Sequence, residues 1–140
     1  MKVILFPLEK VVLDDIEIRL GMAKSDVEVV LGIGKTFDES RYYYQDELAI
    51  DYSSKDNTVE FIELLGGPDG EMQPEIYGVK AFQIDADELE KILCKHNGAD
   101  VDDSEDDSRG YLKISVGIYR ENYVDRWETI GIGVKGYYKK

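Results

Sequence analysis

The stretch DADELEKILCKHNG, residues 85–98, predicts a helix with both of its ends marked. Asp85 and Glu88 have the spacing of a capping box, in which the first side chain accepts from a free backbone amide and the second reaches back. Asn97-Gly98 supplies the stop. Apolar or aromatic positions recur at helical spacing between these ends, at Ala86, Leu89, Ile92, Leu93 and His96. One face of this helix is therefore expected to pack against a sheet.

Strands are predicted on the C-terminal side of this helix. After an acidic loop, residues 100–107, the stretch 111–120 alternates apolar and polar positions, as half-buried strands do. Its aliphatic face would carry Leu112, Ile114, Val116 and Ile118. A last strand is expected over residues 127–137, with Ile130, Ile132 and Val134 on one face.

The first half of the chain has the same order of elements. Ser25 and Glu28 form a second capping-box pattern, and Gly32 ends the predicted helix. Three strands are expected after it, over residues 41–45, 48–52 and 59–65.

A helix followed by antiparallel strands, found twice, predicts an α+β fold: an antiparallel sheet with helices on one face. The length of 140 residues fits a single domain, residues 1–140. The order also admits two helix-plus-sheet half-repeats, residues 1–67 and 71–140, with a glycine-rich joint between them.

Charge is the strongest compositional feature. The chain has 30 Asp and Glu residues against 17 Lys and Arg residues, a net charge of −13. A surface this negative repels phosphate backbones and anionic lipid surfaces, so neither nucleic acid nor a membrane is an expected partner. It would attract a basic protein and speed its association at low salt. Acidic residues also keep proteins soluble, and this simpler role stays open.

Cysteine content and the N-terminal residues bear on the compartment. Cys94 is alone in the sequence, so an intramolecular disulfide and a multi-cysteine zinc site are both ruled out. Residues 1–13 carry a short apolar run that Pro7 and Glu9 interrupt, and this run is too short for a signal peptide or a membrane span. The cytoplasm is therefore the expected location.

Motifs for catalysis or cofactor binding fail on their structural context. His96 lies near the end of its predicted helix, on or beside the packed face, where a lone histidine is usually structural. Cys94 points to another side of that helix. The glycines of residues 131–136 match a dinucleotide-binding pattern, but no helix follows them. The acidic loop lacks the glycine and glutamate that a calcium-binding EF-hand requires.

No enzymatic activity, cofactor or metal is therefore expected. The many carboxylates leave two alternatives open, an acid/base pair and a small-ligand pocket between helices and sheet. Homo-oligomerisation through strand edges, as a structural domain, is a third alternative.

The partner-binding surface is expected on the sheet face turned away from the helices, and in the acidic loop. Tyrosine and tryptophan are enriched at interfaces, and the loop could mimic a phosphate backbone in the cleft of a basic nuclease. The expected partner-binding residues are Tyr111, Tyr119, Tyr123, Trp127, Lys113, Lys135, Asp100, Asp102, Asp103, Glu105, Asp106 and Asp107. Two simpler interpretations stay open, because tyrosines also suit strands and charged loops are usually solvated.

Residues 20–27, LGMAKSDV, followed by Leu31-Gly32, resemble the small repeat of the BamE/SmpA lipoproteins. The same helix-then-sheet module, used twice, builds the β-lactamase inhibitor protein. The resemblance implies a scaffold whose sheet face binds proteins. This sequence shows neither the signal peptide nor the lipid-attachment cysteine of such lipoproteins, which argues against a role in outer-membrane assembly.

The short, acidic and tyrosine-rich profile, together with the segment 127–138, is similar to the immunity proteins of bacterial polymorphic toxin and contact-dependent growth inhibition systems. Those proteins neutralise a toxin domain, often a basic nuclease, by tight stoichiometric binding. The resemblance implies a cytoplasmic inhibitor whose partner is a basic toxin domain.

Overall fold

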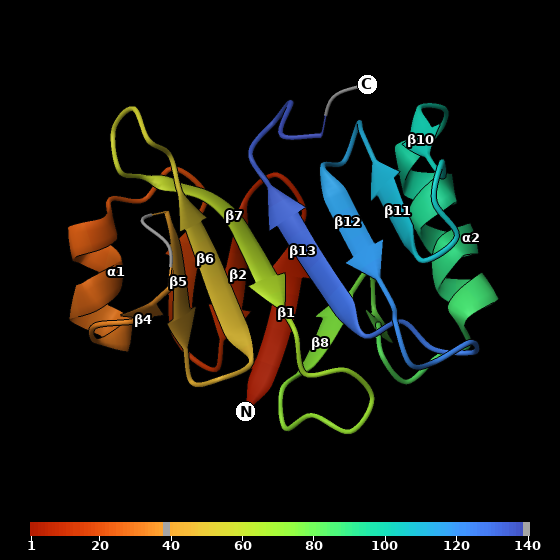
Figure 1. Ribbon diagram of the computed structural model, residues 1–140, viewed down its shortest axis with the longest axis horizontal. Helices are drawn as coiled ribbons and strands as arrows, with labels where there is room; N and C mark the ends of the chain where they lie inside the picture. The colour runs from red at the N-terminus through yellow and green to blue at the C-terminus, as the bar shows by residue number, and fades with distance from the viewer. Residues whose placement is uncertain (38–39, 139–140) are drawn as a thin grey trace.

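In the computed structural model, which describes residues 1–37 and 40–138, the described chain folds into two β-sheets and two helices (Figure 1). The first half forms β1 (Lys2–Phe6), β2 (Lys10–Leu13), β3 (Ile16–Arg19), α1 (Lys24–Leu31), β4 (Lys35–Thr36), β5 (Arg41–Tyr44), β6 (Leu48–Tyr52) and β7 (Val59–Leu64). The second half forms β8 (Gln73–Ile76), β9 (Val79–Lys80), α2 (Ala86–Asn97), β10 (Val101–Asp102), β11 (Ser108–Tyr111), β12 (Val116–Tyr119) and β13 (Thr129–Gly133). The expected α+β class is confirmed, with strands predominating.

The larger sheet has eight antiparallel strands in the order β10-β11-β12-β13-β7-β6-β5-β4. Its centre joins the two halves of the chain, because β13 pairs with β7 and places Ile132 opposite Ile62. The smaller sheet has the order β3-β2-β1-β8-β9, in which β1 and β8 run parallel. Each half therefore contributes strands to both sheets. The proposed half-repeat boundaries stay a prediction.

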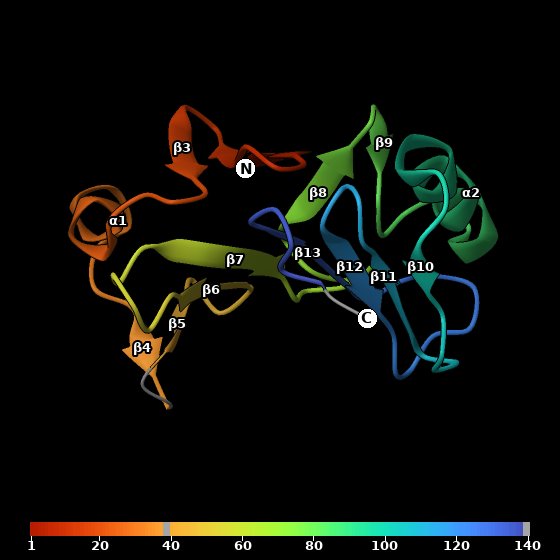
Figure 2. The same cartoon turned by 90° about the horizontal axis from the view of Figure 1, so that it is seen from above.

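The two sheets and the helices form layers. Figure 2 shows the five-stranded sheet over one face of the eight-stranded sheet, with α1 and α2 beside it at either end. The core between the layers is mainly aliphatic and includes Val3, Leu5, Val11, Ile50, Ile62, Leu89, Leu93, Ile130 and Ile132. The ends of the larger sheet curve away from this layer (Figure 2), so its opposite face is concave.

The predicted strand over residues 111–120 is wrong, since this stretch is a hairpin. β11 ends at Tyr111, residues 112–115 turn, and β12 begins at Val116. The buried Asn97 side chain fixes the turn, because its Oδ1 accepts from the amides of Lys113 at 2.8 Å and Ile114 at 3.1 Å. The last strand is likewise shorter than the predicted 127–137.

The helix stops were predicted correctly, but one helix start was not. Gly32 and Gly98 follow the helices with φ of 81° and 76°, which glycine adopts without strain. Asp85 caps α2 as expected. Its side chain accepts from the amide of Asp87, two residues on, whereas a capping box uses the amide three residues on. α1 begins earlier than expected, after Ala23, which has no side-chain cap and bridges to Thr58. Ser25 therefore lies inside α1, and the capping box predicted there is wrong.

Candidate functional site

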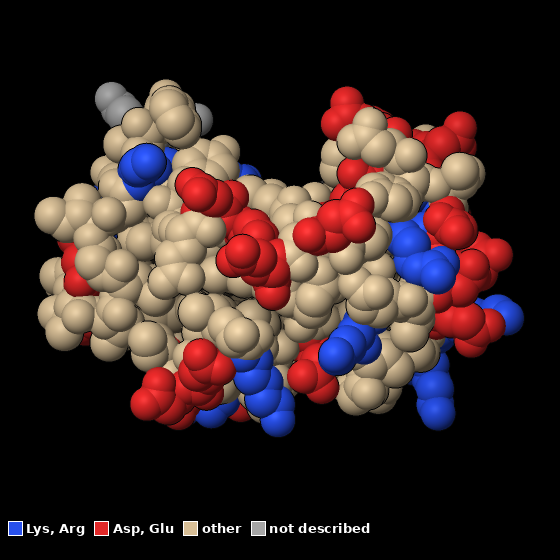
Figure 3. Space-filling view, turned by 90° about the horizontal axis from the view of Figure 1, so that it is seen from below, with Lys and Arg blue, Asp and Glu red and all other residues tan. Residues whose placement is uncertain are grey.

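The candidate site is the concave face of the eight-stranded sheet. Strand register places one residue from each strand in a row across it: Lys35, Tyr43, Ala49, Glu63, Gly131, Gly117, Gly110 and Asp102. Side chains alternate between faces along a strand, so this row faces away from the core. Viewed from below, the face is a notch along the upper edge of the molecule, and carboxylates gather on the lobe at its right (Figure 3).

Three adjacent glycines form the floor of this face, and aromatic rings cover it. A Cβ on Gly117 would overlap the Tyr138 hydroxyl, and a Cβ on Gly110 would lie 3.3 Å from the same ring. Tyr137 stacks on Phe61 with ring centroids 4.6 Å apart and planes 6° apart. Residues 137–138 return across this face and cover its glycines.

A charged group of three residues lies beside the glycine floor. One terminal nitrogen of Arg41 donates to Glu63. The other terminal nitrogen lies 3.4 Å from Oδ2 of Asp51. Burial raises the pKa of Glu63, while the Arg41 charge opposes that shift. The group has two carboxylates and one guanidinium, so the centre of the face is anionic. Sequence reasoning missed these residues, although Asp51 is the one charged residue of the otherwise apolar and aromatic β6.

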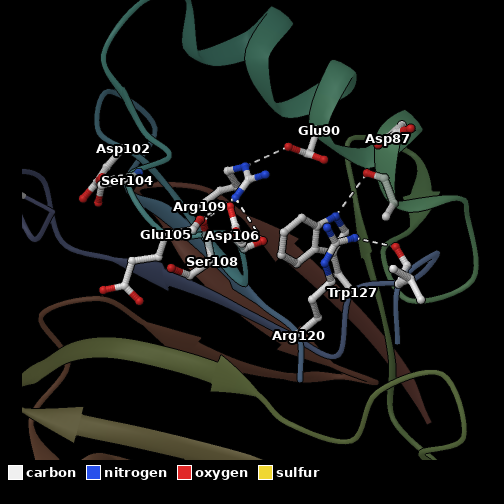
Figure 4. A network of polar contacts seen from close by, with 12 residues as sticks. Asp87, Glu90, Asp102, Ser104, Glu105, Asp106, Ser108, Arg109, Arg120 and Trp127 are labelled. Atoms are coloured by element: carbon white, nitrogen blue, oxygen red, sulfur yellow. Dashed lines mark hydrogen bonds and ion pairs between the residues drawn. The ribbon is translucent and has the colours of Figure 1, made fainter. Parts of the chain in front are cut away.

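The acidic loop lies at one rim of the face and is held in place by Arg109. One Arg109 terminal nitrogen donates to the backbone carbonyls of Glu105 at 2.8 Å and Ser108 at 2.7 Å. Its Nε donates to Glu90 of α2 at 2.9 Å (Figure 4). The loop backbone is therefore tied to α2, while its carboxylates are exposed to solvent.

Trp127 supports this network from inside the core. Its ring is fully buried, and its Nε1 donates to the carbonyl of Ala86 at 3.1 Å. The guanidinium carbons of Arg120 and Arg109 lie 4.4 Å and 5.6 Å from the ring centroid (Figure 4). The expectation that Trp127 contacts a partner is wrong, because no part of the ring is exposed.

Tyr111 is also fully buried, and its expected place on the exposed face is wrong. The error follows from the hairpin at residues 112–115, which the prediction replaced by one continuous strand. In the true register Tyr111 lies opposite Val116 and lies on the same side of the sheet as the core residue Ile132.

A pocket of about 210 Å³ opens on the concave face between the acidic loop and residue 138. Its walls include Glu63, Asp102, Ser108, Arg109, Tyr119 and Tyr138, with Gly110 and Gly117 among the lining residues. Tyr119 is 38% exposed, and the nearby charge of Glu121 is the main cause that raises its pKa. The pocket thus combines two carboxylates and two tyrosine rings with the guanidinium of Arg109, which is already bonded to Glu90 and to a loop carbonyl.

The remaining predicted residues do not line this pocket. Lys113 is exposed in the turn between β11 and β12. Lys135 is exposed two residues before Tyr137 in the sequence. Tyr123 donates its hydroxyl to Asp69. Of the twelve predicted residues, the pocket brings together Tyr119 and Asp102. The other predicted carboxylates of the acidic loop are exposed and do not line the pocket: Asp100, Asp103, Glu105, Asp106 and Asp107.

His96 and Cys94 have surroundings that differ from the expected ones. His96 was expected on or beside the packed face, but it is exposed and stacks on Tyr77, with ring centroids 3.7 Å apart. Cys94 is an exposed free cysteine. Within residues 1–37 and 40–138, no three His, Cys, Asp or Glu side chains are grouped in a way that could hold a metal ion.

Neither helix in the described part of the chain has the length and apolar character needed to cross a membrane. No protein-family model, curated protein or solved structure matches this chain.

Proposed function

We propose that this protein is a cytoplasmic immunity-type inhibitor, which binds a basic toxin domain on the concave face of its eight-stranded sheet and blocks that domain. One observation supports this above the others. The acidic loop is not a free tether, because Arg109 ties its backbone to Glu90 of α2 at the rim of a hollowed face. A surface ordered before binding loses less entropy on association than a mobile one.

Charge gives the proposed inhibitor its selectivity for a basic partner. The net charge of −13 attracts such a partner from a distance, and the loop concentrates that charge at one rim. Exposed carboxylates act mainly on the association rate, and salt screens them. The tyrosine rings on the concave face supply the contact area that slows dissociation.

The experiment begins with capture on the immobilised chain from a lysate of the source organism, washed at rising salt. The captured basic protein is then purified, and its association rate is measured against salt concentration. A loop variant carries Asp103→Asn, Glu105→Gln, Asp106→Asn and Asp107→Asn. The control variant removes four exposed charges outside the eight-stranded sheet and its loops, at Glu9, Asp15, Asp26 and Glu88.

The loop variant is expected to associate at least about tenfold more slowly at low salt than the control variant. The wild-type chain should also abolish the partner's activity at a one-to-one ratio. Equal association rates for the two variants would reject the loop as the steering element. A captured partner that stays active when saturated would reject inhibition.

A second candidate function is binding of a small ligand, with or without catalysis. The pocket of about 210 Å³ with Glu63 and Asp102 in its walls favours it. Glu63 is already bonded to Arg41, which makes it a poor general base. A ligand that raises the melting temperature of the wild type, but not of Glu63→Gln, would favour this candidate.

A further inference from the structure

The pocket on the concave face has the composition of a receptor for one cationic side chain. We infer that it takes the guanidinium group of an arginine on the partner protein, an assignment that rests on the proposed function. Guanidinium is a planar cation that pairs with carboxylates and stacks on aromatic rings. The pocket walls offer both kinds of group, Glu63 and Asp102 as carboxylates and Tyr119 and Tyr138 as rings. Arg109 also lines the pocket, but its guanidinium already donates to Glu90 and to loop carbonyls.

The size of the pocket favours a side chain over a cofactor or substrate. Small-molecule sites usually have volumes of about 300–1,000 Å³, and this pocket has about 210 Å³. That volume suits a guanidinium and part of its alkyl stem. Gly110 and Gly117 line the pocket, and the Tyr138 ring that rests on them forms one of its walls.

Glu63 can accept a further donor. Its Oε1 accepts from Arg41, while an ionised carboxylate has about four acceptor positions in all. Its side chain is 19% exposed, so it remains reachable from the pocket. A second guanidinium would neutralise the carboxylate charge that Arg41 shares between Glu63 and Asp51.

Negatively charged side chains lie near both tyrosines of the pocket, Tyr119 and Tyr138. Glu121, Asp107 and Glu128 all raise the pKa of Tyr119 through their charges, with Glu121 the largest cause. Burial raises the pKa of Tyr138 most, and the charge of Glu63 adds to it. The charge of Arg41 opposes the shift of Tyr138. Carboxylates thus lie near both phenol groups, and their charge favours a cation in the pocket.

The test uses the full chain labelled with ¹⁵N and needs no partner protein. Nα-acetyl-arginine amide is titrated while the amide signals of Gly110 and Gly117 are followed. Nα-acetyl-citrulline amide, which has nearly the same shape without the charge, is the matched control. Nα-acetyl-lysine amide tests the choice of guanidinium over ammonium. Saturable shifts with the arginine amide are expected, with a Kd on the order of millimolar.

Variants locate the binding. Tyr119→Ala should weaken arginine amide binding about two- to fivefold, and Glu63→Gln should weaken it about tenfold. Glu60→Gln is the control on the same strand, since Glu60 does not line this pocket. Tyr119→Ala alters a partly exposed side chain, so it keeps the test decisive if Glu63→Gln fails to fold.

Equal shifts with the citrulline amide, or no loss in Tyr119→Ala, would overturn the cation site. Equal affinity for the lysine amide would overturn the assignment to arginine. The site and the inhibitor role can also fail separately. If the arginine amide binds and no basic protein is inhibited, the site stands and the inhibitor role fails. If an inhibited partner binds Tyr119→Ala and Glu63→Gln like wild type, the role stands and this site fails.

Discussion

The Tyr138 hydroxyl lies directly over Gly117, where any Cβ would overlap it. Gly117 lies opposite Gly110 and Gly131 in the sheet, so the ring rests on adjacent strands that have no side chains at this point. Gly117 has no positive φ that would require glycine. The close approach of Tyr138 is therefore the physical reason for glycine at position 117.

Gly117→Ala is expected to lower the free energy of unfolding by about 1–3 kcal/mol, because the new methyl group collides with the Tyr138 ring. The loss should shrink when Tyr138→Ala is introduced as well, since the smaller side chain leaves room. Urea unfolding of the wild type, both single variants and the double variant gives the coupling directly.

Gly110→Ala is the matched control for this cycle. A Cβ there would lie 3.3 Å from Cδ1 of Tyr138, a distance that a small ring movement relieves. It should destabilise the protein less than Gly117→Ala does. A Gly117→Ala effect that is the same with and without the Tyr138 ring would contradict this account.

The alternation in residues 127–137 predicted the core face of β13 correctly, since Ile130 and Ile132 are buried. It could not predict what covers the other face. Period-two patterns assign residues to faces, whereas the cover depends on where residues 137–138 pack. The same limit applies to residues 111–120, where the pattern of a strand is broken by a turn that Asn97 holds from a different element.

The strands β1, β2 and β3 were not predicted, because their turns carry Pro7 and Asp14-Asp15 and lack a glycine. Their hairpins turn at Leu8, with φ of 67°, and at Asp14, with φ of 55°, without the glycine that usually marks such turns. The charged group was missed for a related reason. Arg41, Asp51 and Glu63 come from three strands, and only the register brings them together.

Asn97→Ala is expected to lower the free energy of unfolding by about 2–4 kcal/mol. The Asn97 side chain is buried and accepts from the amides of Lys113 and Ile114, so alanine leaves two amides without that acceptor. Asn122→Ala is the control, since Asn122 is exposed, and it should change stability by less than about 0.5 kcal/mol. Urea unfolding measures both, and equal effects would contradict the role of Asn97.

Arg109→Gln is expected to release the acidic loop. Glutamine cannot donate at once to Glu90 and to the carbonyls of Glu105 and Ser108. Hydrogen exchange followed by mass spectrometry should show faster exchange in residues 103–107, together with a loss of about 1–3 kcal/mol in stability. Arg19→Gln, an exposed arginine on β3, is the control. Unchanged exchange in the loop would mean that Arg109 does not order it.

Glu128→Gln should remove part of the acid sensitivity of folding. Glu128 Oε2 accepts from the amides of Glu121 at 2.6 Å, Asn122 at 2.7 Å and Tyr123 at 3.1 Å. Burial opposes ionisation, but these bonds outweigh it and lower the pKa of Glu128 below its ordinary 4.5. A lowered pKa in the folded state stabilises the fold above 4.5, and this contribution is lost as the pH falls through the folded-state pKa.

At pH 7 the variant should therefore be less stable than wild type by about 1 kcal/mol, a value reduced for solvent screening. The difference should narrow as the pH falls from about 5 to about 3, because protonation removes the charge from the wild-type side chain as well. Urea unfolding across this range measures the difference. Glu121→Gln, at an exposed position, is the control and should show no comparable pH dependence. A difference that stays constant with pH would mean that the ionised carboxylate does not hold the 121–123 loop.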